Sequence, residues 1–179
     1  MKEISAKELS AMVYSWECIP VIIQEIPNFP QHLSALVDLA FDDSDSRNWR
    51  AAYVVEKIHD LYPDLVVPYL PAMMDFLLIT LNSSKKRHLL KLLSLHPLPE
   101  DRMVDMLNYC IDAFTSAAEP VAVRVNAMQV LFNIAQAEPG FSGELSELIE
   151  HEIEYHGSAG IVSRGKKLLK KLAQSKSVF

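Results

Sequence analysis

The chain has few cysteines and few glycines. Of its 179 residues, two are cysteine and five are glycine. Two cysteines are too few for a disulfide framework, and Cys18 and Cys110 each stand in an apolar run where a free thiol behaves as a small hydrophobic side chain. The scarcity of glycine and the lack of alternating apolar and polar residues exclude a Rossmann-type sheet. We therefore expect a reducing compartment, the cytoplasm, and a fold without strands.

The sequence also lacks an apolar leader and a long apolar run. It begins MKEISAKELS, with charged residues where a signal peptide would need an apolar stretch. The most apolar segment, residues 65–81, contains Asp75, Pro68 and Pro71 and is 17 residues long, which is short for a membrane span. The sequence thus predicts neither export nor a membrane partner, and this segment is expected to form a buried helix.

Basic residues are scarce outside the last part of the chain. The net charge is −6, yet residues 164–179 hold six basic residues and no acidic one, which leaves 11 bases against 23 acids in the rest. Half of all residues are hydrophobic and 22% are charged, a balance typical of a folded protein. The acidic body disfavours binding of phosphate backbones over most of the surface, so a nucleic-acid partner is not expected.

No catalytic, metal or nucleotide motif is complete, and no cofactor is expected. His151 and His156 are five residues apart, about 140° around a helix, so we expect them not to share a metal ion. Glu152 and His156 are four apart and could form a surface pair. The segment 160–167 resembles a phosphate-binding loop, but Lys167 stands where a serine or threonine should bind Mg²⁺, and no strand precedes it. The sequence therefore favours a protein that is not an enzyme.

The chain contains an internal repeat with a period of 37 residues. One stripe of apolar residues recurs at helical offsets 0, 3, 4 and 7, which predicts a helix in each repeat. Turn residues separate this helix from a second one that carries an arginine. The apolar stripe comprises Leu33, Leu36, Val37 and Ala40; then Leu70, Met73, Met74 and Leu77; then Leu107, Cys110, Ile111 and Phe114. Eight positions after the arginines stand Ile58, Leu95, Phe132 and Leu172. A single helix pair cannot bury both stripes, so the pairs are expected to stack.

The segment 119–127, with Glu119-Pro120 followed by Val123-Arg124 and a small residue, is similar to the HEAT-repeat signature. This resemblance covers about residues 28–174 and implies an all-α, right-handed α-α superhelix of about four helical hairpins. Residues 1–27, where Val13 replaces the arginine and Pro20 interrupts a helix, are interpreted as capping helices. Residues 175–179 are expected to be a tail of the same single domain. The resemblance specifies the fold and no particular activity.

Four arginines occupy equivalent positions of the repeat: Arg50, Arg87, Arg124 and Arg164. The resemblance implies that this arginine lies between neighbouring repeats and satisfies carbonyl or carboxylate groups there, so we interpret the four as a structural ladder. Loss of Arg87 or Arg124 is then expected to destabilise the fold by about 1–3 kcal/mol. An anion-binding spine is the alternative interpretation.

A second ladder is acidic. Asp38, Asp75 and Asp112 follow the 37-residue period, and Glu152 is the equivalent in the last repeat. At 100° per residue, Asp38 lies about 150° from the apolar stripe and faces away from the core. The resemblance implies that this helix lines the concave face of the superhelix, so these acids and the nearby Tyr109 form a candidate groove for a basic segment. A solvated polar face is the alternative.

These features favour an interaction module that is not an enzyme and that binds a peptide or protein partner on an acidic concave face. A regulatory subunit of an enzyme would present the same features. The alternative is a nucleic-acid-binding protein, because a family of DNA alkylpurine glycosylases uses HEAT-like repeats. In this chain, the basic patches available for nucleic acid would be residues 85–88 and the last helix.

Overall fold

A computed structural model describes residues 5–176, and within them every regular element is a helix. The chain forms two compact units, Met1–Leu92 and Leu93–Phe179. The first unit contains α1 (Ala6–Val13), α2 (Ile19–Glu25), η1 (Ile26–Asn28), α3 (Gln31–Phe41), η2 (Ser46–Asn48), α4 (Trp49–Leu61), α5 (Pro63–Val66), η3 (Val67–Tyr69), α6 (Leu70–Leu77) and most of α7 (Ser83–Leu93). The second contains η4 (Glu100–Arg102), α8 (Met103–Thr115), α9 (Val121–Ala137), η5 (Pro139–Phe141), α10 (Ser142–His156) and α11 (Ala159–Lys176).

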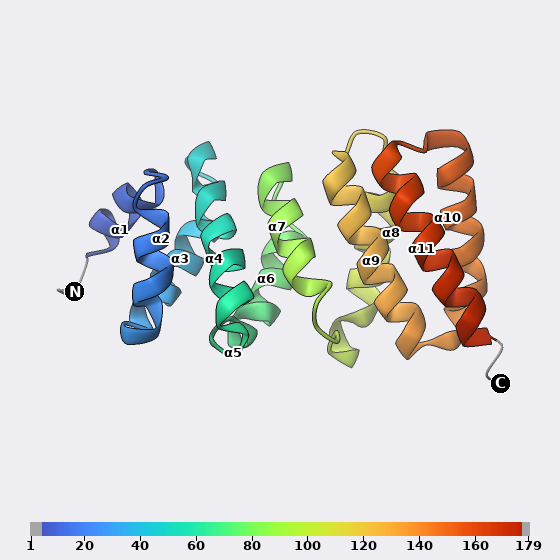
Figure 1. Cartoon of the computed structure of the whole chain (residues 1–179), viewed down its shortest axis with the longest axis horizontal. Coiled ribbons are helices and arrows are strands. Elements are labelled where there is room, and N and C mark those ends of the chain that lie inside the picture. Colours follow the sequence, from blue (N-terminus) through green and yellow to red (C-terminus); the bar gives the residue numbers. More distant parts are fainter. Residues whose placement is uncertain (1–4, 177–179) are drawn as a thin grey trace. The chain divides into compact units, whose positions relative to one another are not determined.

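In the first unit, α3 packs against α4, while α1 packs on α3 and α2 on α4 (Figure 1). The predicted stripe of α3 forms part of the core, with each of its four residues at most 3% exposed. The equivalent stripe of α6 is also buried. Helical periodicity in the sequence therefore identified the buried faces correctly in this unit.

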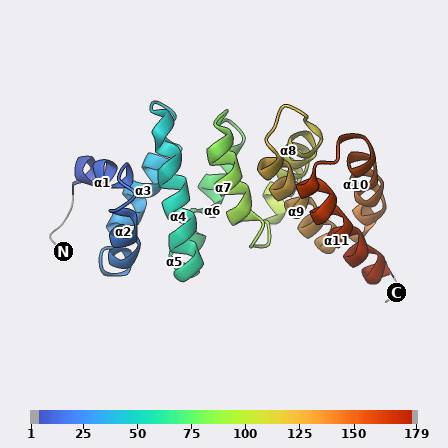
Figure 2. The same cartoon turned by 45° about the horizontal axis from the view of Figure 1, so that its top comes forward.

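In the second unit, α8 and α9 pack closely, and α9 also contacts α10 and α11 (Figures 1 and 2). Cys110 and Phe114 of α8 are fully buried, whereas Leu107 is only partly so. A side chain at Gly165 of α11 would meet Ile153 of α10 at 2.8 Å. Gly165 therefore permits close packing of two helices, which accounts for a glycine in the segment that resembles a phosphate-binding loop.

Helix ends account for one difference from the predicted pattern. Leu95 was expected to be buried as the equivalent of Ile58, but it is 54% exposed while Ile58 is 0% exposed. The reason is that α7 ends at Leu93, two residues before Leu95. At its other end, α7 is capped by Asn82, the residue before its first one. The side-chain oxygen of Asn82 accepts hydrogen bonds from the backbone N–H groups of Ser84 and Lys85.

Candidate functional site

Two of the predicted acidic residues lie in the first unit. Asp38 is on α3 and Asp75 is on α6, and both are exposed. In the sequence, Asp38 comes directly after the buried Val37, and Asp75 comes directly after the buried Met74. The two carboxylates thus lie on the faces of α3 and α6 that point away from the apolar stripes.

In the second unit, α8 has an exposed acidic face. Asp105, Asn108 and Asp112 are exposed and lie on one side of the helix, at spacings of three and four residues. Val104 extends this face toward the start of α8 and is 66% exposed. A helix face that combines acids with an exposed apolar residue can contact a partner that is both apolar and basic.

This face of α8 ends beside a groove with a volume of about 360 Å³. Apolar side chains from the start of α8 and the end of α9 form most of it, and two carboxylates lie at its border. The lining residues are Glu100, Met103, Val104, Leu107, Ile134, Glu138 and Phe141. Glu100 and Glu138 are both exposed, so they can pair with cations that approach from solvent. The partial exposure of Leu107 follows from its place in this groove.

Tyr109 contributes less to this surface than expected. Its side chain is half-buried, and the hydroxyl group is buried without a hydrogen-bond partner among the described residues. Burial, with smaller contributions from the nearby Cys110 and Glu119, raises the pKa of Tyr109 well above its usual value. The phenol therefore stays neutral and offers a partner only part of its ring.

The four arginines of the predicted ladder have different surroundings. Arg50 donates to the backbone carbonyl of Tyr14, and its guanidinium lies 4.7 Å from the centre of the Trp16 ring. Arg164 is exposed and donates to the side-chain oxygen of Gln129 at 2.7 Å. All three of these contacts join a ladder arginine to another helix or turn within the same unit.

Arg87 and Arg124 differ most clearly in burial. Arg87 is exposed, and its Nη2 lies 2.8 Å from Nε2 of His88, the next residue of the same helix. Arg124 is 6% exposed and donates to the carbonyl of Phe114 at 2.8 Å and to Glu152 at 2.6 Å. The same repeat position thus holds a surface residue in α7 and a buried ion pair in α9.

Glu152 does not lie on an exposed acidic face, so the sequence prediction for this residue is wrong. Its side chain is 3% exposed and forms the buried partner of Arg124. The prediction transferred the orientation of Asp38 to Glu152 across an insertion. The carboxyl group of Glu152 instead contacts the guanidinium of Arg124 inside the second unit.

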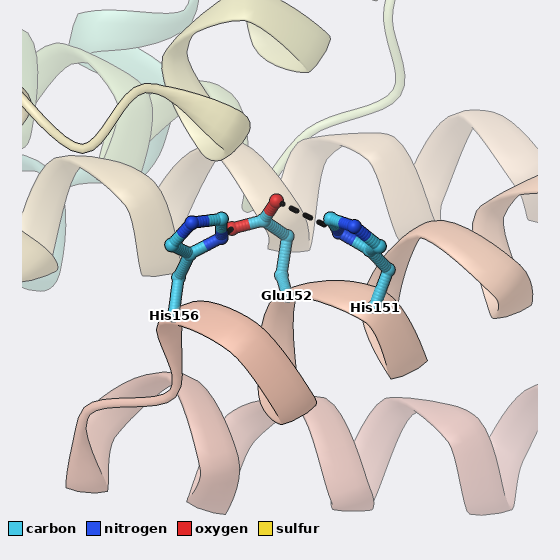
Figure 3. A group of neighbouring side chains, drawn as sticks. All are labelled: His151, Glu152 and His156. Carbon is cyan, nitrogen blue, oxygen red and sulfur yellow. Dashed lines mark ion pairs between the residues drawn. The ribbon is translucent and has the colours of Figure 1, made fainter.

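Two histidines complete the surroundings of this carboxylate (Figure 3). Nδ1 of His156 lies 3.2 Å from one oxygen of Glu152, and Nδ1 of His151 lies 3.4 Å from the other. The potential ligand atoms of all three residues are within 4.8 Å of one another. The two rings therefore approach one carboxylate although their positions are about 140° apart around the helix. Glu152 lies between them around the helix, about 100° from His151 and 40° from His156, so both rings can turn toward it.

The predicted basic patch of the first unit is largely internal. Lys85 is fully buried and donates to the carbonyl of Asp42 and the carboxylate of Asp43, each at 2.7 Å. His88 is 3% exposed and contacts Glu56 at 2.6 Å. Two of the four residues in segment 85–88 are thus buried inside the protein.

Glu56 is the centre of a second buried polar cluster. Burial opposes ionisation of its carboxyl group, but hydrogen bonds from His88 and Lys91, together with their charges, lower its pKa to about 2. The carboxylate therefore stays ionised and links α4 to α7.

The fold and these contacts define a class of all-α proteins built from repeated helix pairs. The family model for the HEAT repeat domain matches residues 6–172, and the chain belongs to this family. HEAT repeats generally mediate protein–protein interaction, and proteins of this family are typically non-enzymatic scaffolds. No curated protein and no solved structure matches the chain. None of the helices described here has the length and apolar character needed to cross a membrane.

Proposed function

We propose that this protein is a non-enzymatic interaction module that binds a peptide or protein segment carrying both apolar and basic side chains. The observation that carries this proposal is the groove between the start of α8 and the end of α9, with its apolar walls and its two border carboxylates, Glu100 and Glu138. A large apolar side chain of the partner would fill the groove. Flanking lysines or arginines would pair with the two carboxylates.

Exposed acidic residues outside the groove also favour a basic partner. Asp105 and Asp112 continue from the groove along α8, and Asp38 and Asp75 lie on exposed faces of the first unit. Both cysteines are free, in keeping with the reducing, cytoplasmic location that we propose. The burial of Lys85 and His88 leaves less cationic surface than the sequence suggested for a nucleic-acid partner.

The proposal can be tested by selecting binders from a displayed library of random peptides. We expect selected peptides to combine a large apolar residue with nearby lysines or arginines. The double variant Glu100→Lys/Glu138→Lys should weaken the binding of such a peptide about tenfold or more, since attraction becomes repulsion. Val104→Asp should weaken it as well, because it places a charge at the apolar groove.

A matched control uses two acids that lie outside the groove. Glu144 and Glu147 are exposed residues of α10, and Glu144→Lys/Glu147→Lys changes the net charge by the same amount. This control should bind the selected peptide like the unmodified protein. Equal binding by both charge-reversed variants would exclude the groove as the site. A salt-sensitive shift of duplex DNA by the unmodified protein would instead favour the nucleic-acid alternative.

A further inference from the structure

The end of α10 brings together two imidazole rings and a carboxylate (Figure 3). From this cluster of His151, Glu152 and His156 we infer a binding site for a divalent transition-metal ion, with Zn²⁺ as the ion that fits best. Imidazole nitrogen and carboxylate oxygen are the donors with which zinc is commonly bound in proteins. The inference is independent of the partner-binding groove.

The two nitrogen–oxygen distances in the cluster match those of a zinc site, but they end on different oxygens of Glu152, and the three ligand atoms lie within 4.8 Å of one another. Ligand atoms that bind one zinc ion at about 2.0–2.1 Å in tetrahedral geometry lie roughly 3.4 Å from one another. Nδ1 of His156 and Nδ1 of His151 lie 3.2 Å and 3.4 Å from the Glu152 oxygens. Both imidazole side chains are about half exposed, His151 at 56% and His156 at 45%. They can therefore make the small rotations that bring the two nitrogens to one ion.

Arg124 holds the carboxylate in place for this role. Its guanidinium binds one oxygen of Glu152 at 2.6 Å, and His156 contacts this same oxygen, while the other oxygen faces His151. A ligand carboxylate that also accepts a hydrogen bond from a neighbouring group is common in metal sites, because that bond fixes its orientation. The buried half of the site is thus fixed, and only the two exposed rings need to move.

The charge around the cluster favours a cation despite the nearby guanidinium. His156 is the last residue of α10, where the partial negative charge of the helix C-terminus stabilises positive charge. Glu150 and Glu154 of the same helix are exposed acids on either side of Glu152 in the sequence. They lie about 160° around the helix from Glu152, on the opposite face, so the end of the helix is the nearer source of negative charge.

Three protein ligands would leave one position of a tetrahedral zinc ion open to solvent. Water can occupy that position, or a histidine, cysteine or carboxylate of a bound partner can replace the water. The alternative is an ion-pair cluster in which each histidine donates its Nδ1–H to Glu152. In that case Nδ1 has no lone pair for a metal. The two interpretations therefore differ in whether the protein binds zinc.

The test is calorimetric titration of the full chain, without a histidine tag, with ZnCl₂. We expect one ion per chain, and the double variant His151→Ala/His156→Ala should weaken binding at least about 100-fold. Because both rings are about half exposed, this variant should keep the helical circular dichroism of the unmodified protein. His156→Gln alone provides a second measurement with a smaller change in shape.

The control variant Glu150→Gln/Glu154→Gln removes two carboxylates from the same helix and keeps the cluster. It should retain one-to-one zinc binding. Co²⁺ in place of zinc should produce visible absorption bands of low-symmetry, four-coordinate cobalt that disappear in the double histidine variant. The inference is overturned if the unmodified protein binds no zinc, or if the double histidine variant binds it equally well.

Discussion

The buried pair of Arg124 and Glu152 makes a strong prediction about stability. Arg124→Ala removes two donors at once, the one to Glu152 at 2.6 Å and the one to the carbonyl of Phe114 at 2.8 Å. The carboxylate that remains is 3% exposed, and its other neighbours are the two half-exposed histidines. We therefore expect the second unit to lose much of its stability.

The expected loss follows from the burial of both charges. Breaking a buried ion pair by removing one partner costs about 3–5 kcal/mol, because an uncompensated charge stays inside the protein. This exceeds the 1–3 kcal/mol that hydrogen-bond loss alone predicts. It is a large fraction of the about 5–15 kcal/mol that stabilises a typical folded protein.

Urea unfolding followed by far-ultraviolet circular dichroism measures this loss. With a slope of about 2 kcal/mol per molar urea, Arg124→Ala should lower the midpoint by roughly 2 M. Arg87→Ala provides the matched comparison, since this arginine is exposed and contacts the adjacent His88. It should cost less than Arg124→Ala, at most about 1–3 kcal/mol, because it removes a hydrogen bond to buried His88 while the charge that is lost lies at the surface.

A second variant tests the stated cause. Arg124→Met/Glu152→Leu replaces both charges by apolar side chains, so no unpaired charge remains. We expect it to recover most of the stability that Arg124→Ala loses. An unchanged midpoint for Arg124→Ala would refute the reasoning outright. A double variant as unstable as Arg124→Ala would show that the buried charge is not the source of the loss.

Two further predictions concern ionisable groups in the core. The pKa of Glu56 is about 2 against an ordinary value of 4.5, so its contribution of about 3 kcal/mol is fully present above pH 4.5 and is lost as the pH falls toward 2. Glu56→Gln should flatten this part of the acid-unfolding curve, and an identical acid profile would contradict the assignment. Cys110 is fully buried, which raises the pKa of its thiol. Iodoacetamide should therefore modify the partly exposed Cys18 well before Cys110, as peptide mass spectrometry can show, and equal rates would contradict this.

The helices and their buried faces were predictable because both depend on local periodicity. A stripe such as Leu33, Leu36 and Val37 must face a neighbouring helix in any packed arrangement, and all three are buried. The groove of the second unit was not predictable in this way. Its walls come from Met103 and Ile134, which lie on different helices, and periodicity does not say where two helices leave a gap.

The cluster on α10 was predicted only in part: the sequence indicated the pair of Glu152 and His156 but not the contribution of His151. The angle between two positions on a helix describes where the Cα–Cβ bonds point, and by that measure His151 and His156 diverge. Imidazole rings extend well beyond Cβ, and the two rings converge on Glu152 because it lies between them. A residue such as Glu152, which lies between two candidate ligands on the helix, can thus bring their side chains together.

The arginine ladder shows what an internal repeat determines. A period of 37 residues places Arg87 and Arg124 at the same point of their helices, but it does not determine which residue each arginine contacts. Arg124 meets the carboxylate of Glu152 and becomes buried, whereas Arg87 lies beside His88, whose own partner is Glu56. A repeat therefore specifies position, and the neighbouring helix decides whether that position holds a surface cation or a buried ion pair.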